Sequence, residues 1–205
     1  MKILIIGSGR CGSSQLQLAL HKELNLPWCS EPFNTDLKVS KIPYQNGRVN
    51  LRNIMDGAGI VKLCAPAPQI PASFNIKGCV EFAHKFDLVI CLDRRNEGER
   101  ILSALHAIKY DTWYGKYKPQ KLTLSMDEPE IINHIVNQKT ALHEIARILG
   151  QEVIYLEDLY EKDWKTFFHP WYGVMSKQWS EGYETDNDFS GLADYFDPKA
   201  RYCEV

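Results

Sequence analysis

The sequence lacks any long apolar run, any strong excess of one charge and any closely spaced pair of cysteines. A membrane-spanning helix needs about 20 consecutive apolar residues, and none of that length is present. The formal net charge of −2 gives no basic footprint for nucleic acid. The six cysteines include no Cys-x-x-Cys pair and no histidine at zinc spacing. We therefore expect no membrane, no nucleic acid and no metal among the partners of this chain.

The apolar run near the N-terminus is short and leads directly into glycines, so it predicts a strand and not a signal peptide. A cytoplasmic protein is the default expectation. In that compartment the scattered cysteines are expected to be buried free thiols. Cys11 is the candidate exception, because an electropositive loop can lower the pKa of a thiol and make it reactive.

Residues 2–14 are the stretch around which the chain is organised. Ile3 to Ile6 are β-branched and apolar, which predicts a buried parallel strand, and the glycines that follow allow a tight turn. Leucines then recur at helical spacing, and Ser13 or Ser14 is expected to cap the first turn of that helix. A strand, a glycine loop and a helix N-terminus together predict an anion-binding site.

Three further apolar runs predict strands at 59–64, 87–92 and 152–156. Helices are expected over 72–85, from 96 to about 108, from 127 to Gly150 and over 158–168. Alternating strands and helices predict an α/β fold with three layers, α/β/α, around a parallel sheet of four to five strands. We expect one domain over 1–205, with its core in 1–168 and an aromatic-rich tail in 169–205.

Two segments carry weaker patterns. Residues 24–34 form a short apolar segment bounded by Pro27 and Pro32, too short and broken for a central strand. Residues 35–58 are polar, show no firm period and are interpreted as a variable excursion. Trp113 and Tyr114, in a later loop, are candidates for stacking on a base or an acceptor, or for anchoring the loop.

The glycine loop fits more than one nucleotide-binding template. As Gly-x-x-x-x-Gly-Lys-[Ser/Thr] it is a triphosphate loop in which Ser13 replaces the lysine, with Asp93 as a candidate Mg²⁺ ligand at a strand end. As Gly-x-Gly-x-x-Gly it is a dinucleotide fingerprint, with Glu31 at the distance of the acidic residue that binds ribose. The missing lysine weakens the first interpretation, and the broken segment around Glu31 weakens the second.

Several short motifs resemble those of sulfotransferases that use 3′-phosphoadenosine 5′-phosphosulfate. Residues 9–14 are similar to the Pro-Arg-Ser-Gly-Ser-[Thr/Ser] loop of that family, with glycine for proline and cysteine for the first serine. Arg95 and Ser103 match its Arg-x₇-Ser signature, and residues 30–33 resemble its Glu-Pro-Phe segment. Residues 153–160 are similar to its strand ending in Tyr-Glu-Asp-Leu. Cytosolic members have Lys-x-His where this chain has Lys62 and Cys64, so the chain is closer to the branch with a glutamate base.

The resemblance implies a P-loop-like fold and a role for each matching residue. Glu31 is the expected base, Arg10 the ligand of the 5′-phosphosulfate, and Lys62 a stabiliser of the transferring sulfonate. Arg95 and Ser103 are expected to bind the 3′-phosphate of the donor. The residues expected to contact the donor are Gly9, Arg10, Cys11, Gly12, Ser13, Ser14, Arg95 and Ser103.

Transfer of a sulfuryl group needs no bridging metal, so none is expected at the site. The acceptor is expected to be a hydroxyl group of a small molecule or a carbohydrate. Three alternatives stay open: a P-loop nucleotide kinase or NTPase, a nucleotide-binding module without catalysis, and an NAD(P)-dependent oxidoreductase.

Overall fold

The computed structural model describes residues 1–33, 47–66, 75–110 and 129–161. Within them the chain forms one parallel five-stranded sheet, in the order β2-β3-β1-β4-β5. The strands are β1 (Lys2–Gly7), β2 (Trp28–Ser30), β3 (Gly59–Cys64), β4 (Leu88–Asp93) and β5 (Val153–Tyr155). The helices are α1 (Ser13–Leu24), α3 (Leu51–Met55), α4 (Ile76–Ala83), α5 (Glu97–Tyr110), α6 (Pro129–Leu149) and α7 (Leu156–Glu161).

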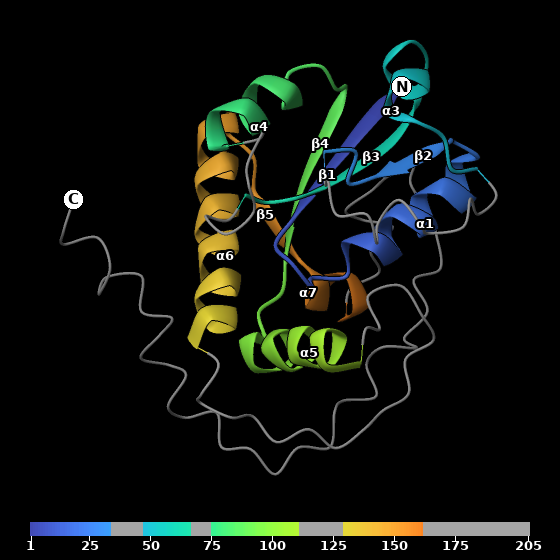
Figure 1. Ribbon diagram of the computed structural model, residues 1–205. Coiled ribbons are helices and arrows are strands. Elements are labelled where there is room, and N and C mark those ends of the chain that lie inside the picture. Colours follow the sequence, from blue (N-terminus) through green and yellow to red (C-terminus); the bar gives the residue numbers. More distant parts are fainter. Residues whose placement is uncertain (34–46, 67–74, 111–128, 162–205) are drawn as a thin grey trace.

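Helices cover both faces of the sheet, which confirms the expected α/β three-layer fold (Figure 1). On one face α3, α4 and α6 pack on alternate strand residues such as Leu4 and Ile6. On the other face α1 and α7 pack on the residues between them, such as Ile3 and Ile5. Because both faces are buried, the central strand is apolar throughout instead of alternating. In Figure 1, α5 lies below the sheet, beyond the carboxyl ends of the strands.

The four apolar runs form strands within one or two residues of their expected bounds. The structure adds two elements that the sequence patterns did not predict. Trp28–Ser30 is a strand of three residues at the edge of the sheet, where Pro27 and Pro32 disrupt no central ladder. The expected excursion over 35–58 contains the short helix α3, whose first turn is capped by the side chain of Asn50.

The strand order determines where a ligand is expected to bind. The chain leaves β1 toward one edge of the sheet and later crosses back, so α1 lies on one face and α4 and α6 on the other. Open α/β sheets bind ligands in the crevice at such a switch point, outside the carboxyl ends of the strands. Here that point is the glycine loop after β1.

The same order disfavours the dinucleotide template. In the dinucleotide-binding fold the second strand lies directly beside the first, which brings its terminal acidic residue to the ribose. In this protein β3 lies between β1 and β2. Glu31, just after β2, is therefore one strand farther from the loop than that template requires.

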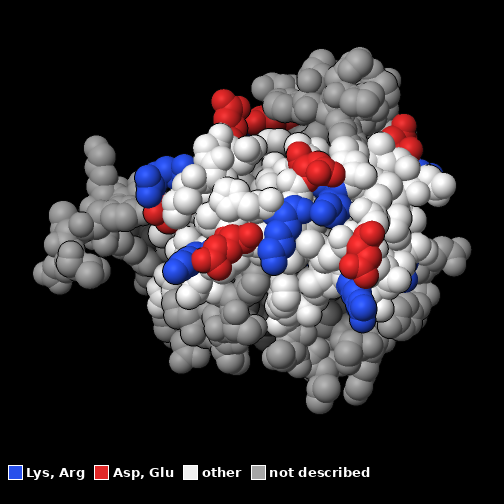
Figure 2. Space-filling view, turned by 90° about the horizontal axis from the view of Figure 1, so that it is seen from above, with Lys and Arg blue, Asp and Glu red and all other residues white. Residues whose placement is uncertain are grey.

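The surface around the amino ends of the strands carries both charges. Figure 2 views that end of the molecule, where the acidic and basic side chains of the described residues are interspersed. Arg52 on α3 pairs with Asp56 just after that helix, and Lys77 pairs with Glu81 on α4; both are exposed ion pairs. No helix among the described residues has the length and apolarity to cross a membrane. The aromatic-rich tail and the loop with Trp113 and Tyr114 lie outside the described residues.

Candidate active site

The glycine loop joins β1 to α1 through two residues with left-handed backbone. Arg10 has a φ of 64° and Gly12 a φ of 81°. Gly12 occupies the N-cap of α1, and it has no side chain that could accept a hydrogen bond from the first turn. The prediction that Ser13 or Ser14 caps this helix is therefore wrong, because both serines lie inside its first turn.

Side chains from α6 and α7 hold the loop in shape. The N–H of Gly9 donates to Oε1 of Gln138 at 2.9 Å, and a Cβ at Gly9 would lie 2.3 Å from that oxygen. A Cβ at Gly12 would lie 2.7 Å from Leu156 Cδ1. The sulfotransferase loop has proline at the position of Gly9, and proline has no N–H to donate. The contact with Gln138 thus gives a physical reason for glycine at this point.

Cys11 does not behave as the sequence pattern indicated. Its side chain is fully buried against the α1 face of the sheet, beside Ile3, Ile5 and Leu16. Burial raises the pKa of the Cys11 thiol, and the nearby charge of Asp93 raises it further. The prediction of a lowered pKa is therefore wrong, because loss of water outweighs the polarity of the loop. Cys11 is a packing residue.

A short ion pair forms where β2 and β3 end. The register of the two strands pairs Ser30 with Lys62, so Glu31 follows directly beside that lysine. The Lys62 ammonium donates to Glu31 Oε1 at 2.7 Å and to Ser14 Oγ at 2.9 Å. The Lys62 side chain is 4% exposed and that of Glu31 13%. The structure thus joins the expected base, the expected cation and the start of α1 in one cluster.

Cys64 extends this cluster from the end of β3. Its thiol donates to the same Oε1 of Glu31 at 3.4 Å. Burial, and then the charge of Glu31, raises the pKa of Cys64 far above its ordinary value, so the thiol keeps its proton. Cys64 therefore contributes a weak donor to the carboxylate. Its position in Lys-x-Cys was noticed in the sequence, but its contact with Glu31 was not predicted.

A second polar cluster surrounds Asp93, on the other side of β1. Asp93 is fully buried and accepts hydrogen bonds from Ser8 Oγ at 2.5 Å, from Arg100 Nη1 at 3.1 Å and from His143 Nε2 at 2.9 Å. Burial acts to raise the pKa of Asp93, but the hydrogen bond from His143 and the charge of Arg100 outweigh it and lower the pKa. Both carboxylate oxygens are therefore engaged by side chains of the protein.

The two residues expected at the 3′-phosphate have different hydrogen-bond partners in the structure. Ser103 Oγ, buried on α5, accepts from Arg10 Nε at 2.9 Å. Arg95 instead makes two hydrogen bonds to Asp158, at 2.5 and 2.6 Å, and its guanidinium lies 4.3 Å from the centroid of the Tyr155 ring. Among the described residues no hydrogen bond joins Arg95 to Ser103.

The Glu-Asp pair after β5 has a structural role. Glu157 accepts from the backbone N–H groups of Arg95 and Asn96, both at 3.0 Å, just before α5 begins. A carboxylate at this position satisfies donors at the start of α5 and complements its dipole. Glu157 therefore attaches α7 to the turn after β4. Its carboxylate occupies the place where an anion could otherwise bind the N–H groups of that turn.

Gln138 was missed by the sequence analysis, although a signal for it exists. It is 3% exposed and lies between Ile135 and Leu142 on the apolar face of α6. A polar residue on such a face requires a buried partner, which here is the N–H of Gly9. The apolar period of that helix therefore marks Gln138 as a residue with a specific contact.

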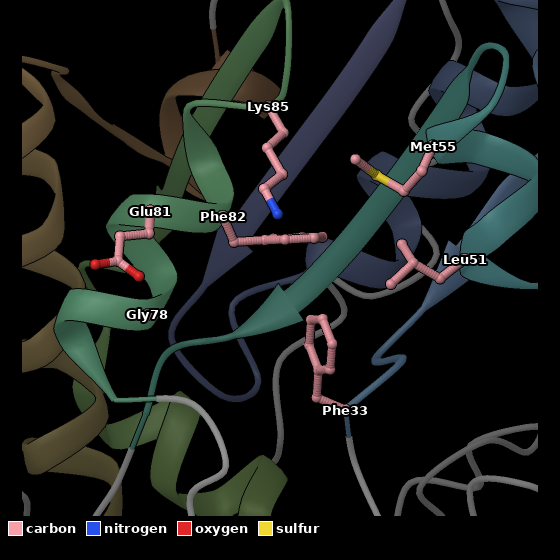
Figure 3. Close-up of a pocket in the computed structure, with 7 residues that line it drawn as sticks. All are labelled: Phe33, Leu51, Met55, Gly78, Glu81, Phe82 and Lys85. Atoms are coloured by element: carbon pink, nitrogen blue, oxygen red, sulfur yellow. The ribbon is translucent and has the colours of Figure 1, made fainter.

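A pocket of about 500 Å³ lies away from these clusters (Figure 3). Phe33, Leu51, Met55 and Phe82 line it, between α3 and α4, and the ring centroids of Phe33 and Phe82 are 5.2 Å apart. These residues pack on the α4 face of the sheet, whereas Lys62 contacts α1 on the opposite face. None of the expected site residues lines this pocket.

Comparison of the chain with family models, with curated proteins and with solved structures finds no match.

Proposed function

We propose that this protein is a sulfotransferase that moves a sulfuryl group from 3′-phosphoadenosine 5′-phosphosulfate to a hydroxyl acceptor. The observation that carries the proposal is the ammonium of Lys62, which bridges Ser14 at the start of α1 and Glu31 after β2. It brings a cation, a carboxylate and the glycine loop together at the switch point of the sheet. These are the groups that the motif resemblance assigns to the transfer.

The bridge also argues against a Mg²⁺-dependent NTPase. In that class the loop serine or threonine and an aspartate at a strand end hold the metal. Here the corresponding hydroxyl, of Ser14, accepts from Lys62, and the corresponding aspartate, Asp93, is engaged by Arg100 and His143. A fixed side-chain cation suits a sulfuryl group, which carries less negative charge than a phosphoryl group.

The chemistry follows from the positions of the side chains. The donor supplies the sulfuryl group. From the motif resemblance, its 5′-phosphosulfate is expected to lie against the glycine loop. Glu31 takes the proton of the acceptor hydroxyl as the hydroxyl oxygen bonds to sulfur. Lys62 stabilises charge on the sulfuryl oxygens, and Arg10 with the loop N–H groups stabilises the phosphate oxygen from which sulfur departs. The products are a sulfate ester, adenosine 3′,5′-bisphosphate and a proton on Glu31.

Ligand binding tests the proposal against its alternatives. We expect calorimetric titration to detect binding of adenosine 3′,5′-bisphosphate without added metal, and no comparable binding of NAD or of ATP with Mg²⁺. With an active hydroxyl acceptor, turnover of the donor should be unchanged by EDTA. Tight binding of NAD would favour the oxidoreductase, and ATP turnover that stops with EDTA would favour the kinase or NTPase. Donor binding without turnover of any acceptor would indicate a binding module.

The remaining expectations stay predictions. They are a cytoplasmic location, a small-molecule or carbohydrate acceptor, and the absence of nucleic-acid and membrane partners.

A further inference from the structure

The pocket between α3 and α4 combines apolar walls with one exposed cation. We propose that it binds a small aromatic anion, such as an aryl carboxylate, whose ring lies against the apolar side chains and whose charge meets Lys85. The site contains none of the residues assigned to sulfuryl transfer, so the proposal does not depend on that reaction. Its volume of about 500 Å³ lies within the range of roughly 300–1,000 Å³ that is usual for small-molecule sites.

Two aromatic rings form a corner of the pocket. Phe33 and Phe82 meet edge to face, with ring centroids 5.2 Å apart and an angle of 85° between the ring planes (Figure 3). Phe82 also contacts the ring of Phe86, with centroids 5.0 Å apart. Aromatic rings attract one another in edge-to-face and offset-stacked arrangements, and this corner offers a third ring both a face and an edge. It therefore favours a flat aromatic ligand.

The opposite wall of the pocket comes from α3. Leu51 and Met55 lie one turn apart on this helix, and both are partly buried against the core. In Figure 3 their side chains lie across the pocket from Phe82. Methionine adapts its shape to its neighbours, and its sulfur makes favourable contacts with aromatic rings. A ring that entered the pocket would thus meet apolar groups on two sides.

Lys85 supplies the charge that would select an anion. It is exposed just after α4, and its ammonium lies 6.0 Å from the centroid of the Phe82 ring (Figure 3). Among the described residues no carboxylate lies within ion-pair distance of this ammonium. Glu81, the acidic residue of the lining, points away from the rings and pairs with Lys77 at 3.9 Å. The pocket therefore complements an aromatic monoanion better than a neutral or cationic ring.

The test follows the methionine methyl groups by NMR while 2-naphthoate is added to the full chain. The chain has four methionines, and Met55→Leu, which nearly conserves volume, identifies the signal of Met55. We expect that signal to shift until the site is saturated, because the ring currents of a bound naphthyl group change the shielding of a neighbouring methyl group. The expected dissociation constant is about 1 mM or lower.

The role of the charge is tested by a neutral ligand of nearly the same shape. We expect 2-naphthamide to bind about two- to fivefold more weakly than 2-naphthoate, the effect usual for an exposed ion pair. Lys85→Met should remove this preference and leave the affinity for the amide unchanged. Lys22→Met, an exposed lysine on α1 at the opposite face of the sheet, is the matched control and should keep the preference.

Three results would overturn the proposal. The Met55 signal fails to shift in a saturable manner, the unaltered protein binds the acid and the amide equally, or Lys85→Met keeps the preference for the acid. None of them bears on the sulfotransferase proposal, whose residues lie elsewhere.

Discussion

Two carboxylates, Glu31 and Asp93, each pair with a cation near the carboxyl ends of the strands. They lie on opposite sides of β1 in the sheet. Asp93 is fully buried and has Ser8, Arg100 and His143 as hydrogen-bond partners. Glu31 is 13% exposed, contacts Lys62 and Cys64, and adjoins the exposed Ser14 through that lysine. A carboxylate without access to solvent or ligand can stabilise the fold, whereas one that a substrate can approach can also accept a proton.

Because the two carboxylates differ in burial and in their partners, we expect substitutions in the two clusters to affect different quantities. The Asp93 cluster joins β4, α5 and α6 to the loop through Ser8, so substitutions in it should lower the free energy of unfolding. The Glu31 cluster joins β2, β3 and α1, and removal of its carboxylate should lower the turnover rate. Each of the following experiments alters one carboxylate or its partner and asks whether the effect appears in the expected quantity.

Glu31→Gln should have the largest effect, and it should fall on turnover. The substitution keeps the shape of the side chain and removes the proton acceptor. We expect kcat to fall by roughly 10²- to 10⁴-fold, with little change in affinity for adenosine 3′,5′-bisphosphate. The measurement is steady-state kinetics with a hydroxyl acceptor found by screening alcohols, phenols and sugars. Glu23→Gln, an exposed glutamate on α1, is the control. Near-normal turnover would show that another group takes the proton.

Arg100→Met should have the next largest effect, and it should fall on stability. The guanidinium of Arg100 is fully buried and pairs with Asp93, so its removal leaves a buried carboxylate without its main counter-charge. We expect the free energy of unfolding to fall by about 3–5 kcal/mol, as measured by urea denaturation. Arg52→Met removes the exposed partner of Asp56 and should cost far less. Equal losses in the two variants would contradict the role assigned to Asp93.

The smallest expected effect is a change in the pH dependence of stability. Because the pKa of Asp93 is lower in the folded protein than its ordinary value, its ionised form stabilises the fold at pH values above that ordinary value. This contribution disappears as the pH falls through the lowered pKa. The difference in urea midpoint between the unaltered protein and Asp93→Asn should therefore be full at pH 7 and shrink below about pH 4. A difference that stays constant down to pH 3 would contradict it.

Much of the fold was predictable from local pattern. The runs at 3–6, 59–64 and 87–92 are largely apolar because helices cover both faces of the sheet, and they form β1, β3 and β4. β2 and α3 were missed because neither is long enough to show a period. The edge position of β2 also explains how prolines on both sides are tolerated.

The contacts of the site were less predictable, because they depend on register and side-chain packing. Glu31 meets Lys62 only because Ser30 pairs with that lysine across the two strands. The sequence spacing of Arg95 and Ser103 indicated a shared ligand, yet Asp158 and Arg10 are their partners in the fold. Such pairings join segments far apart in the chain and leave no local signal.

The contacts that fix the glycine loop have a consequence for folding during synthesis. Gly9 donates to Gln138, a residue 129 positions later, and Gly12 packs against Leu156. A ribosome adds about 5–20 residues per second, so the loop is synthesised well before the helices that shape it. A nascent chain that ends before α6 therefore has the strand and the glycines but lacks the partners that fix the loop. The phosphate binding proposed for this loop should therefore arise only after the last helix of the described core has left the ribosome.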